Sequence, residues 1–240
     1  MKTTLHINKN LLFIAHRGGL YYRPENSIAA VDYIYKQNIH WIESDVRMSK
    51  DGIPVLFHDE RLHVPGLGNR AVRELHSRDL KKIDVGGGEM IPTLEGLLKR
   101  FGDKLSFDFD IKELDAVERV IALIKKFKLE QKIVITSFIP EALQRSLELA
   151  PDIKRGFLLD RLTGALVDGQ HAVNAALLLK CDFFIPHFKL LSLDWAGTAQ
   201  AKGLKVMVWT VNRLNDARKL IEMGVCGLIS DRPDYLRDKI

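Results

Sequence analysis

The sequence predicts an α/β protein, a (β/α)8 barrel that forms one domain over residues 1–240. Short apolar runs rich in β-branched residues alternate with amphipathic stretches along the whole chain, and this alternation is typical of parallel strands covered by helices. The runs give about eight strand–helix units, which is the number in this barrel. The length of 240 residues is also close to the ~250 residues that such a barrel needs.

The candidate strands are the apolar runs themselves. Two of them, 41–47 and 55–57, are close neighbours, and we merge them into one unit so that about eight remain. A doubly wound open sheet is the structural alternative to the barrel. In chain order, the candidate strands are residues 11–15, 41–47, 55–57, 105–111, 133–137, 153–159, 183–186, 205–210 and 227–230.

Candidate helices follow the strands, and two of them carry clear start signals. Glu25-Asn26-Ser27 offers an N-cap, and Thr93 offers another with the acidic Glu95 in the first turn. The helices are expected to begin near Asn26, Thr93, Leu114, Pro140, Gly164, Leu193, Leu214 and Pro233.

One irregular stretch, about residues 59–92, lies between an early strand and the helix at Thr93. It is rich in Arg, His, Gly and Asp, and we expect a small insertion over the mouth of the barrel, since long loops in compact domains are often functional. Its glycine run, Gly86-Gly87-Gly88, follows no clear strand and lacks the GxGxxG spacing, so it does not indicate a dinucleotide site.

The composition is ordinary for a globular enzyme, with 46% hydrophobic and 28% charged residues. The net charge of +5 favours anionic small-molecule substrates. Lysine and arginine are scattered over apparent helix faces without interleaved aromatics, so nucleic acid is not an expected partner. The oligomeric state is left open by the sequence.

The expected location is the cytoplasm. The segment Met1–Ile7 holds no apolar run long enough for a signal peptide, and no segment approaches the roughly 20 apolar residues of a membrane span. Stable membrane insertion is therefore not expected. The two cysteines, Cys181 and Cys226, are enough for one disulfide, but such low usage favours a reducing compartment.

Two histidines follow predicted strands. His16, with Arg17 beside it, comes directly after the run 11–15, and His58 comes after the run 55–57. Active sites of barrels lie at the carboxyl ends of the strands, histidine titrates near neutral pH, and arginine offers a two-pronged grip on phosphate. We hypothesise an acid–base pair, although either histidine taken alone is more often structural.

Glu43 and Asp45 lie two residues apart in the run 41–47, so both project from the same face of one strand. The neighbours Ile42 and Val46 mark the other face as apolar. Buried carboxylates repel each other unless they are neutralised, and a hard divalent cation is the economical explanation. The alternative is an exposed polar face of an edge strand.

A second acidic strand alternates in the same way. Asp108, Asp110 and Lys112 lie on one side of the run 105–111 and its end, and the phenylalanines lie on the other. A metal, a phosphate or a buried network of ion pairs would offset the cost of these charges. The network is a serious alternative for Asp108 in particular.

Together the strand ends hold a set of groups that suits phosphoryl chemistry. A metal would neutralise phosphate oxygens, and arginine and lysine would hold the remaining charge. One histidine would take a proton while the other protonates the leaving alkoxide. The sequence contains no GxSxG serine elbow and no zinc-like spacing of cysteine and histidine.

These motifs, in order over nearly the full chain, resemble the signature of the glycerophosphodiester phosphodiesterase family. Each fragment is weak alone, but the ordered set is highly specific. The matching motifs are His16-Arg17-Gly18, Pro24-Glu25-Asn26-Ser27, Glu43-Ser44-Asp45-Val46, residues 49–55, His58-Asp59, residues 91–95, Asp110-Ile111-Lys112, residues 208–212 and residues 227–233.

The resemblance implies a barrel with a small insertion, and hydrolysis of a glycerophosphodiester to sn-glycerol 3-phosphate and an alcohol with Mg²⁺ or Ca²⁺. By position, it implies the following roles: His16 and His58 as the acid–base pair; Glu43, Asp45 and Asp110 as metal ligands; Arg17 and Lys112 on the phosphate; Glu25 at the metal and glycerol end; and Trp209 as a wall of the pocket.

The chain departs from the family pattern at two positions. The family usually has Glu where this chain has Asp110, which is one methylene shorter, and Thr is commoner than Ser27. Sphingomyelinase D-like phospholipases tend to use Asp at the position of Asp110, so a lipid phosphodiesterase that cyclises its substrate is one alternative. A non-catalytic barrel that binds phosphodiesters is another.

Three residues also have plain structural interpretations. Glu25 would then serve the next helix through its dipole, and Trp209 would be a core aromatic. Asp231 is expected to cap the last helix rather than to take part in catalysis. The head group, the choice between Mg²⁺ and Ca²⁺, and the attacking group (water or the glycerol hydroxyl) are not indicated by the sequence.

Overall fold

The protein is described by a computed structural model over residues 11–64, 66, 68–164 and 166–240. Eight parallel strands close into a barrel, in the order β1-β11-β10-β9-β8-β7-β6-β2, and β2 pairs with β1 to complete the ring. The barrel strands are β1 (Leu12–Ala15), β2 (Trp41–Met48), β6 (Ser106–Ile111), β7 (Ile133–Ser137), β8 (Lys154–Leu159), β9 (Phe183–Pro186), β10 (Lys205–Val208) and β11 (Gly227–Ser230).

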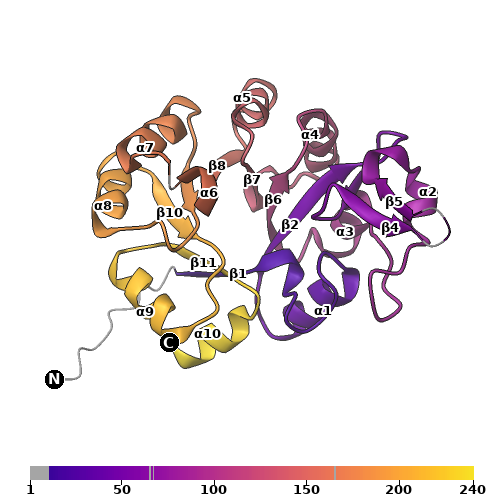
Figure 1. Ribbon diagram of the computed structural model, residues 1–240, viewed down its shortest axis with the longest axis horizontal. Coiled ribbons are helices and arrows are strands. Elements are labelled where there is room, and N and C mark those ends of the chain that lie inside the picture. Colours follow the sequence, from indigo (N-terminus) through magenta and orange to yellow (C-terminus); the bar gives the residue numbers. More distant parts are fainter. Residues whose placement is uncertain (1–10, 65, 67, 165) are drawn as a thin grey trace.

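Helices surround the ring, as Figure 1 shows. Ser27 and Thr93 cap α1 and α3 as predicted, because their hydroxyls accept hydrogen bonds from the backbone N–H groups of Ala30 and Gly96. The longer helices are α1 (Ile28–Lys36), α3 (Leu94–Phe101), α4 (Ala116–Phe127), α5 (Pro140–Leu149), α7 (Gly169–Leu178), α8 (Leu193–Ala201), α9 (Leu214–Glu222) and α10 (Pro233–Lys239). The predicted (β/α)8 barrel is therefore confirmed.

The core has two layers, and alternation along the strands separates them. Phe107 and Phe109 of β6 face outward and pack with apolar side chains of the helices. A smaller cluster inside the ring contains Ile14, Val134 and Ile185. On β6 the inward positions are Asp108 and Asp110, so the strand pattern brings carboxylates into the barrel.

The run at 55–57 is a strand, but it is not part of the ring. It forms β3 (Pro54–Leu56), which runs antiparallel to β2. The link between the two strands is only a short turn, too short for the crossover that parallel pairing requires. His58 therefore follows a strand, as predicted, and this strand belongs to the same unit as β2: β3 runs back alongside β2, and Phe57 N–H donates to the carbonyl of Asp45.

The predicted insertion lies beside the barrel, on the right in Figure 1, next to β2 and α3. It contains the hairpin of β4 (Arg61–Val64) and β5 (Gly68–Ala71) and the short helix α2 (Ser77–Leu80). A small apolar cluster of its own, with Leu62, Val72 and Leu80, holds it to β3.

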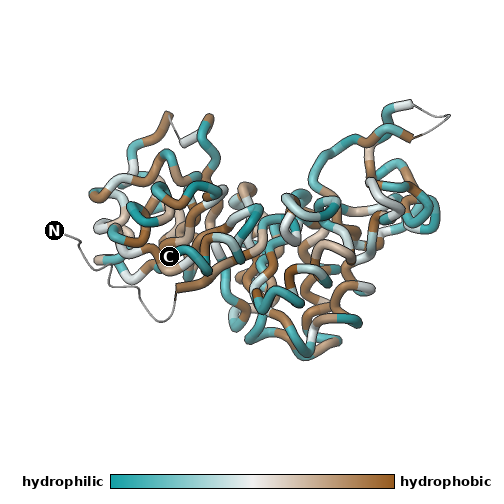
Figure 2. Tube along the Cα trace, turned by 90° about the horizontal axis from the view of Figure 1, so that it is seen from below, coloured by the Kyte–Doolittle hydropathy of each residue, from teal (hydrophilic) through white to brown (hydrophobic). Residues whose placement is uncertain are grey.

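Figure 2 shows that hydrophobic residues lie mainly in the interior of the molecule and that hydrophilic residues lie mainly on the outside. Among the described residues, no helix has both the length and the apolar character needed to cross a bilayer. The prediction that no signal peptide is present concerns the segment Met1–Ile7. This segment lies outside the described residues.

Candidate active site

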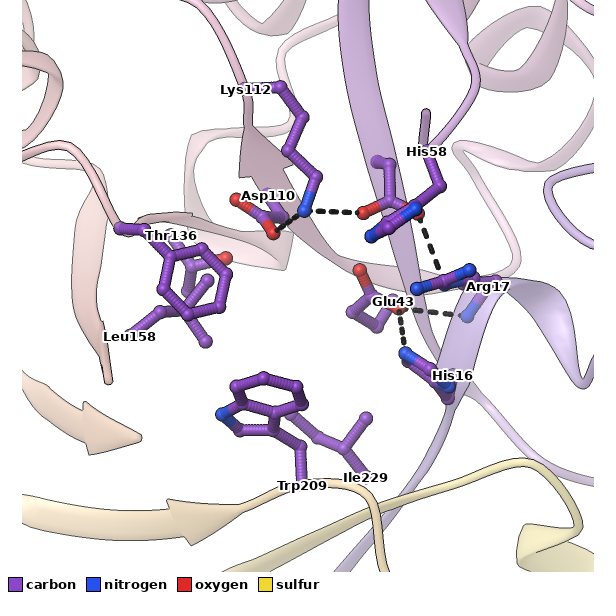
Figure 3. A pocket seen from close by; sticks show the side chains of 12 residues that line it. His16, Arg17, Glu43, His58, Asp110, Lys112, Thr136, Leu158, Trp209 and Ile229 are labelled. Carbon is purple, nitrogen blue, oxygen red and sulfur yellow. Dashed lines mark hydrogen bonds and ion pairs between the residues drawn. The ribbon is translucent and has the colours of Figure 1, made fainter. Parts of the chain in front are cut away.

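A cavity opens at the carboxyl ends of the strands, and it gathers most of the residues that the sequence singled out. Figure 3 shows its polar side chains on one side and its apolar side chains on the other. The lining consists of His16, Arg17, Glu43, Asp45, His58, Asp110, Lys112, Thr136, Phe138, Leu158, Trp209 and Ile229.

Three buried carboxylates form a compact cluster in this cavity. Glu43 and Asp45 come from β2 and Asp110 from β6, where Asp45 and Asp110 are direct partners across the two strands. One oxygen of each lies within 4.8 Å of the others. Oδ1 of Asp110 is buried without a hydrogen-bond partner. An all-oxygen donor set with a spare buried oxygen fits a hard cation such as Mg²⁺ or Ca²⁺.

Burial makes the charges of this cluster costly. Desolvation and the neighbouring carboxylates Asp45 and Asp108 raise the pKa of Glu43 well above its usual value. Burial likewise raises the pKa of Asp110 to about 6, although Lys112 opposes the shift. Burial acts against ionisation of Asp45 too, but Lys112 and Arg17 outweigh it and hold the pKa of Asp45 below its usual value. A cation would remove the repulsion that remains.

Lys112 bridges two of the carboxylates. Its ammonium lies 2.9 Å from Asp45 Oδ1 and also donates to Asp110. The pKa of Lys112 is raised: burial opposes this, but Asp110 and Asp45 outweigh it. Lys112 is thus a fixed positive charge at the wall of the cavity.

Arg17 supplies a second fixed positive charge. Its Nη1 donates to Glu25 at 2.7 Å, its Nε lies 3.5 Å from Asp45 Oδ2, and its backbone N–H donates to Glu43 at 2.8 Å. A tight turn follows, and Gly19 is needed there because a Cβ would lie 2.6 Å from the side chain of Ile34. The turn therefore holds Arg17 against the acidic cluster.

His16 is oriented from two sides. Its Nε2 lies 4.0 Å from Glu43 Oε2, and its Nδ1 lies 2.6 Å from Asp231 Oδ1. Asn212 makes two hydrogen bonds to the same aspartate. Its Nδ2 donates to Asp231 Oδ2 at 2.5 Å, and its Oδ1 accepts from Asp231 N–H at 2.9 Å. Asp231 therefore holds the ring with its Nε2 toward the cavity.

The interpretation of Asp231 as a helix cap is wrong. The capping position of α10 is Arg232, and no side chain caps that helix. The pKa of Asp231 is lowered: burial opposes this, but the contacts with His16 and Asn212 outweigh it. The motif that contains Asp231 was visible in the sequence, but its link to His16 depends on the closing of the ring.

His58 reaches the cavity from the turn after β3. Its Nδ1 lies 2.7 Å from Asp59 Oδ1, and Arg47 Nε donates to its backbone carbonyl at 2.9 Å. Arg47 also pairs with Glu113 at 3.0 Å. Arg47, held by its ion pair with Glu113, thus fixes the backbone position of His58.

The other side of the cavity is apolar. Trp209 packs edge-to-face against Phe138, with ring centroids 5.4 Å apart, and its Nε1 donates to the carbonyl of Ile185 at 3.1 Å. Leu158 and Ile229 complete this wall. One half of the cavity thus suits a charged group of a substrate, and the other half suits its apolar part.

Two candidate residues lie next to the cavity rather than in its lining. Glu25 contacts Arg17, and the N-terminus of α1 is capped by Ser27 instead. Asp108 is fully buried, and Thr136 Oγ1 donates to it at 2.5 Å. Burial raises the pKa of Asp108 to about 7. Asp108 therefore lies next to the acidic cluster without lining the cavity.

The chain is similar to known phosphodiesterases over almost its whole length. Residues 16–235 match the model of the glycerophosphoryl diester phosphodiesterase family. A glycerophosphodiester phosphodiesterase of Caldanaerobacter subterraneus is 32% identical over 238 residues, which cover 94% of this chain and 96% of the relative.

Solved structures show the same similarity. A glycerophosphodiester phosphodiesterase of Thermotoga maritima matches with a TM-score of 0.81 at 25% identity, over 95% of this chain and 98% of that one. A phosphodiesterase of Oleispira antarctica, solved in complex with the product sn-glycerol-3-phosphate, matches with a TM-score of 0.83 at 27% identity, over 94% of both chains.

Proposed function

Since the chain belongs to the glycerophosphoryl diester phosphodiesterase family, we propose that it hydrolyses glycerophosphodiesters to sn-glycerol 3-phosphate and an alcohol, using Mg²⁺ or Ca²⁺. The observation that carries the proposal is the buried cluster of Glu43, Asp45 and Asp110 beside two histidines. The Oleispira antarctica structure, which holds sn-glycerol-3-phosphate, supports the choice of product.

Glu43, Asp45 and Asp110 would hold the divalent cation. When bound, a divalent cation neutralises phosphate charge and favours ionisation of an attacking hydroxyl. Arg17 and Lys112 flank the same carboxylates and would hold the phosphate oxygens. Glu25 would keep the guanidinium of Arg17 in place, since the two are 2.7 Å apart.

His16 and His58 would move the protons. Each ring has a carboxylate at Nδ1, Asp231 for His16 and Asp59 for His58, so each can present Nε2 to a substrate. One ring would take the proton of the attacking hydroxyl, and the other would protonate the leaving alkoxide. Trp209, on the apolar wall, would exclude water from the substrate and contact its carbon atoms.

The first test is release of sn-glycerol 3-phosphate from glycerophosphocholine and glycerophosphoethanolamine, with Mg²⁺, with Ca²⁺ and with EDTA. We expect release that depends on the metal. Phosphorus NMR would distinguish the open monoester from a cyclic phosphate, which a cyclising phospholipase would form. Metal binding without any turnover would instead indicate a barrel that only binds phosphodiesters.

The second test concerns the acid–base pair. We expect His16→Ala and His58→Ala each to lower kcat by roughly 10²- to 10⁴-fold, the usual contribution of a positioned proton donor or acceptor. Circular dichroism would check that both variants stay folded, and His171→Ala, on an exposed face of α7, is the matched control. Near-normal rates in both site variants would contradict the assignment.

The predicted cytoplasmic location has a separate test. The cysteines Cys181 and Cys226 are unpaired, which is compatible with a reducing compartment. Fractionation of cells that express the protein, followed by immunodetection, would check the location directly.

A further inference from the structure

Exposed large apolar side chains gather on the face that carries the active-site cavity. Leu162 and Leu166 have exposed fractions of 85% and 87%, and Leu193 of 69%. The first two lie in the connection from β8 to α7, which contains the short helix α6 (Arg161–Gly164), and Leu193 is the first residue of α8. In this barrel, strand-to-helix connections lie at the carboxyl ends of the strands, where the cavity opens.

These leucines belong to segments that pack against each other. A Cβ placed on Gly164 of α6 would lie 2.3 Å from Leu190, in the connection from β9 to α8. A Cβ on Gly169, at the start of α7, would lie 2.0 Å from the indole of Trp195 in α8. The connections that carry the exposed leucines are thus packed closely against each other.

The same surface continues to the cavity. His187 and Phe188 begin the connection that carries Leu190, and the ring of His187 lies 5.3 Å from that of Trp209. Trp209 lines the cavity. In the side view of Figure 2, hydrophobic stretches of the chain also lie at the upper left edge of the molecule.

A second sector of this face combines aromatic rings and a cation. The guanidinium of Arg232 lies 5.4 Å from the ring of Tyr21 and 4.5 Å from that of Tyr235. Tyr21 is 64% exposed and follows β1, and Tyr235 lies in the first turn of α10. Rings with a polar tip, next to arginine, are the residues that gather where lipid meets water.

Two further exposed cations flank the leucines. Arg161 opens α6, and Lys189 lies beside Phe188, with its ammonium 5.8 Å from that ring. Nearby carboxylates are engaged with the backbone: Asp160 accepts from Leu162 and Thr163 N–H, and Asp168 accepts from Gln170 N–H. Arg161 and Lys189 are exposed and form no ion pair among the described residues, so both are available to an external anion.

We propose that this face docks onto the surface of a lipid bilayer with anionic head groups, with Leu162 and Leu166 entering the interface. The apolar and aromatic residues come from separate connections around one opening, an arrangement that fits a broad surface better than a single peptide. Arg161 and Lys189 match anionic lipid phosphates. Docking would bring the active-site cavity to diesters that lie in the membrane surface.

The test is co-sedimentation with vesicles of phosphatidylcholine alone and of phosphatidylcholine mixed with phosphatidylglycerol. We expect the wild-type chain to bind the mixed vesicles, and the double variant Leu162→Ser with Leu166→Ser to bind on the order of tenfold more weakly. Leu178→Ser is the matched control, because Leu178 is 81% exposed but ends α7 at the opposite face. It should bind like the wild type.

A charge variant tests the electrostatic part. Lys189→Gln should weaken binding to the mixed vesicles roughly fivefold and leave the weaker binding to phosphatidylcholine unchanged. Vesicle binding is read without turnover, so a failure of the proposed hydrolysis would not affect it. Hydrolysis of soluble glycerophosphoethanolamine, where present, should be the same in all four proteins.

Three outcomes would overturn the proposal. The wild type could fail to bind either vesicle, or Leu178→Ser could lose as much binding as the double variant. The third outcome is a difference in oligomeric state: size-exclusion chromatography would show a dimer for the wild type and a monomer for the double variant. The face would then be a contact between copies of the chain.

Discussion

At the scale of single residues, the contact between His16 and Asp231 decides which nitrogen of the ring faces the cavity. A carboxylate 2.6 Å from Nδ1 favours the tautomer that carries its proton on Nδ1. Asn212 fixes the aspartate in turn. Asp231 is therefore a positioning residue for the proposed proton transfer.

Asp231→Asn should lower kcat by roughly 10- to 100-fold and change KM little, because orientation of the ring is lost while the binding groups remain. Steady-state kinetics on glycerophosphoethanolamine would measure this. Asp234→Asn is the control, since Asp234 accepts from the hydroxyl of Tyr22 instead of contacting His16. Equal effects of the two substitutions would argue against a link through His16.

Asp110 is one of the two positions at which the sequence is expected to depart from the family pattern. Its Oδ1 is buried without a partner, and Oδ2 accepts from Lys112. We expect Asp110→Ala to raise the metal concentration for half-maximal activity by roughly tenfold or more, because one of three ligands is lost. Asp110→Glu, which restores the usual family residue, should retain metal-dependent activity. An unchanged metal titration of Asp110→Ala would remove this residue from the ligand set.

At the scale of elements, the β2–β3 hairpin brings His58 to the cavity. β2 extends to Met48, and β3 returns beside it until Leu56 lies opposite Val46. Arg47 then holds the carbonyl of His58 and the carboxylate of Glu113 at the same time. One guanidinium thus joins the hairpin to the connection that follows β6.

Arg47→Ala should lower the free energy of unfolding by about 1–3 kcal/mol, because it leaves the mostly buried Glu113 without its partner. It should also lower kcat through displacement of His58. Urea denaturation and kinetics would measure the two effects. Arg73→Ala, which breaks an exposed pair with Asp115, should change stability by less than about 0.5 kcal/mol.

The elements differ in how far the sequence predicts them. Alternation along 41–47 and 105–111 correctly placed Glu43, Asp45 and Asp110 on inward faces, because a strand fixes side-chain direction locally. The direction of β3 was not predicted, because a strand of three residues carries no pattern that separates parallel from antiparallel pairing. The partner of Asp231 was missed because it lies 215 residues away in the chain.

At the scale of the whole molecule, a bound cation would join neighbouring strands of the barrel. Glu43 and Asp45 belong to β2 and Asp110 to β6, so the cation would offset repulsion inside the ring. Ligand that binds only the folded state stabilises it by about 2.7 kcal/mol at 100 times its dissociation constant. Stability should therefore depend on metal.

We expect the melting temperature to rise when Mg²⁺ or Ca²⁺ is added to EDTA-treated protein, as measured by differential scanning fluorimetry. The rise should be much smaller in Asp110→Ala. Asp152→Ala, which removes an exposed carboxylate at the opposite end of the barrel, should leave it unchanged. A rise that is the same in all three proteins would point to metal bound elsewhere.

The way the ring closes has a consequence during synthesis of the protein. His16 follows β1, but the aspartate that orients it follows β11 and lies 215 residues further along the chain, so β11 must pair with β1 to bring them together. A growing chain on the ribosome thus carries both histidines and the three carboxylates of the cluster long before Asp231 is made. The ring can close, and His16 can be oriented, only after β11 has left the exit tunnel.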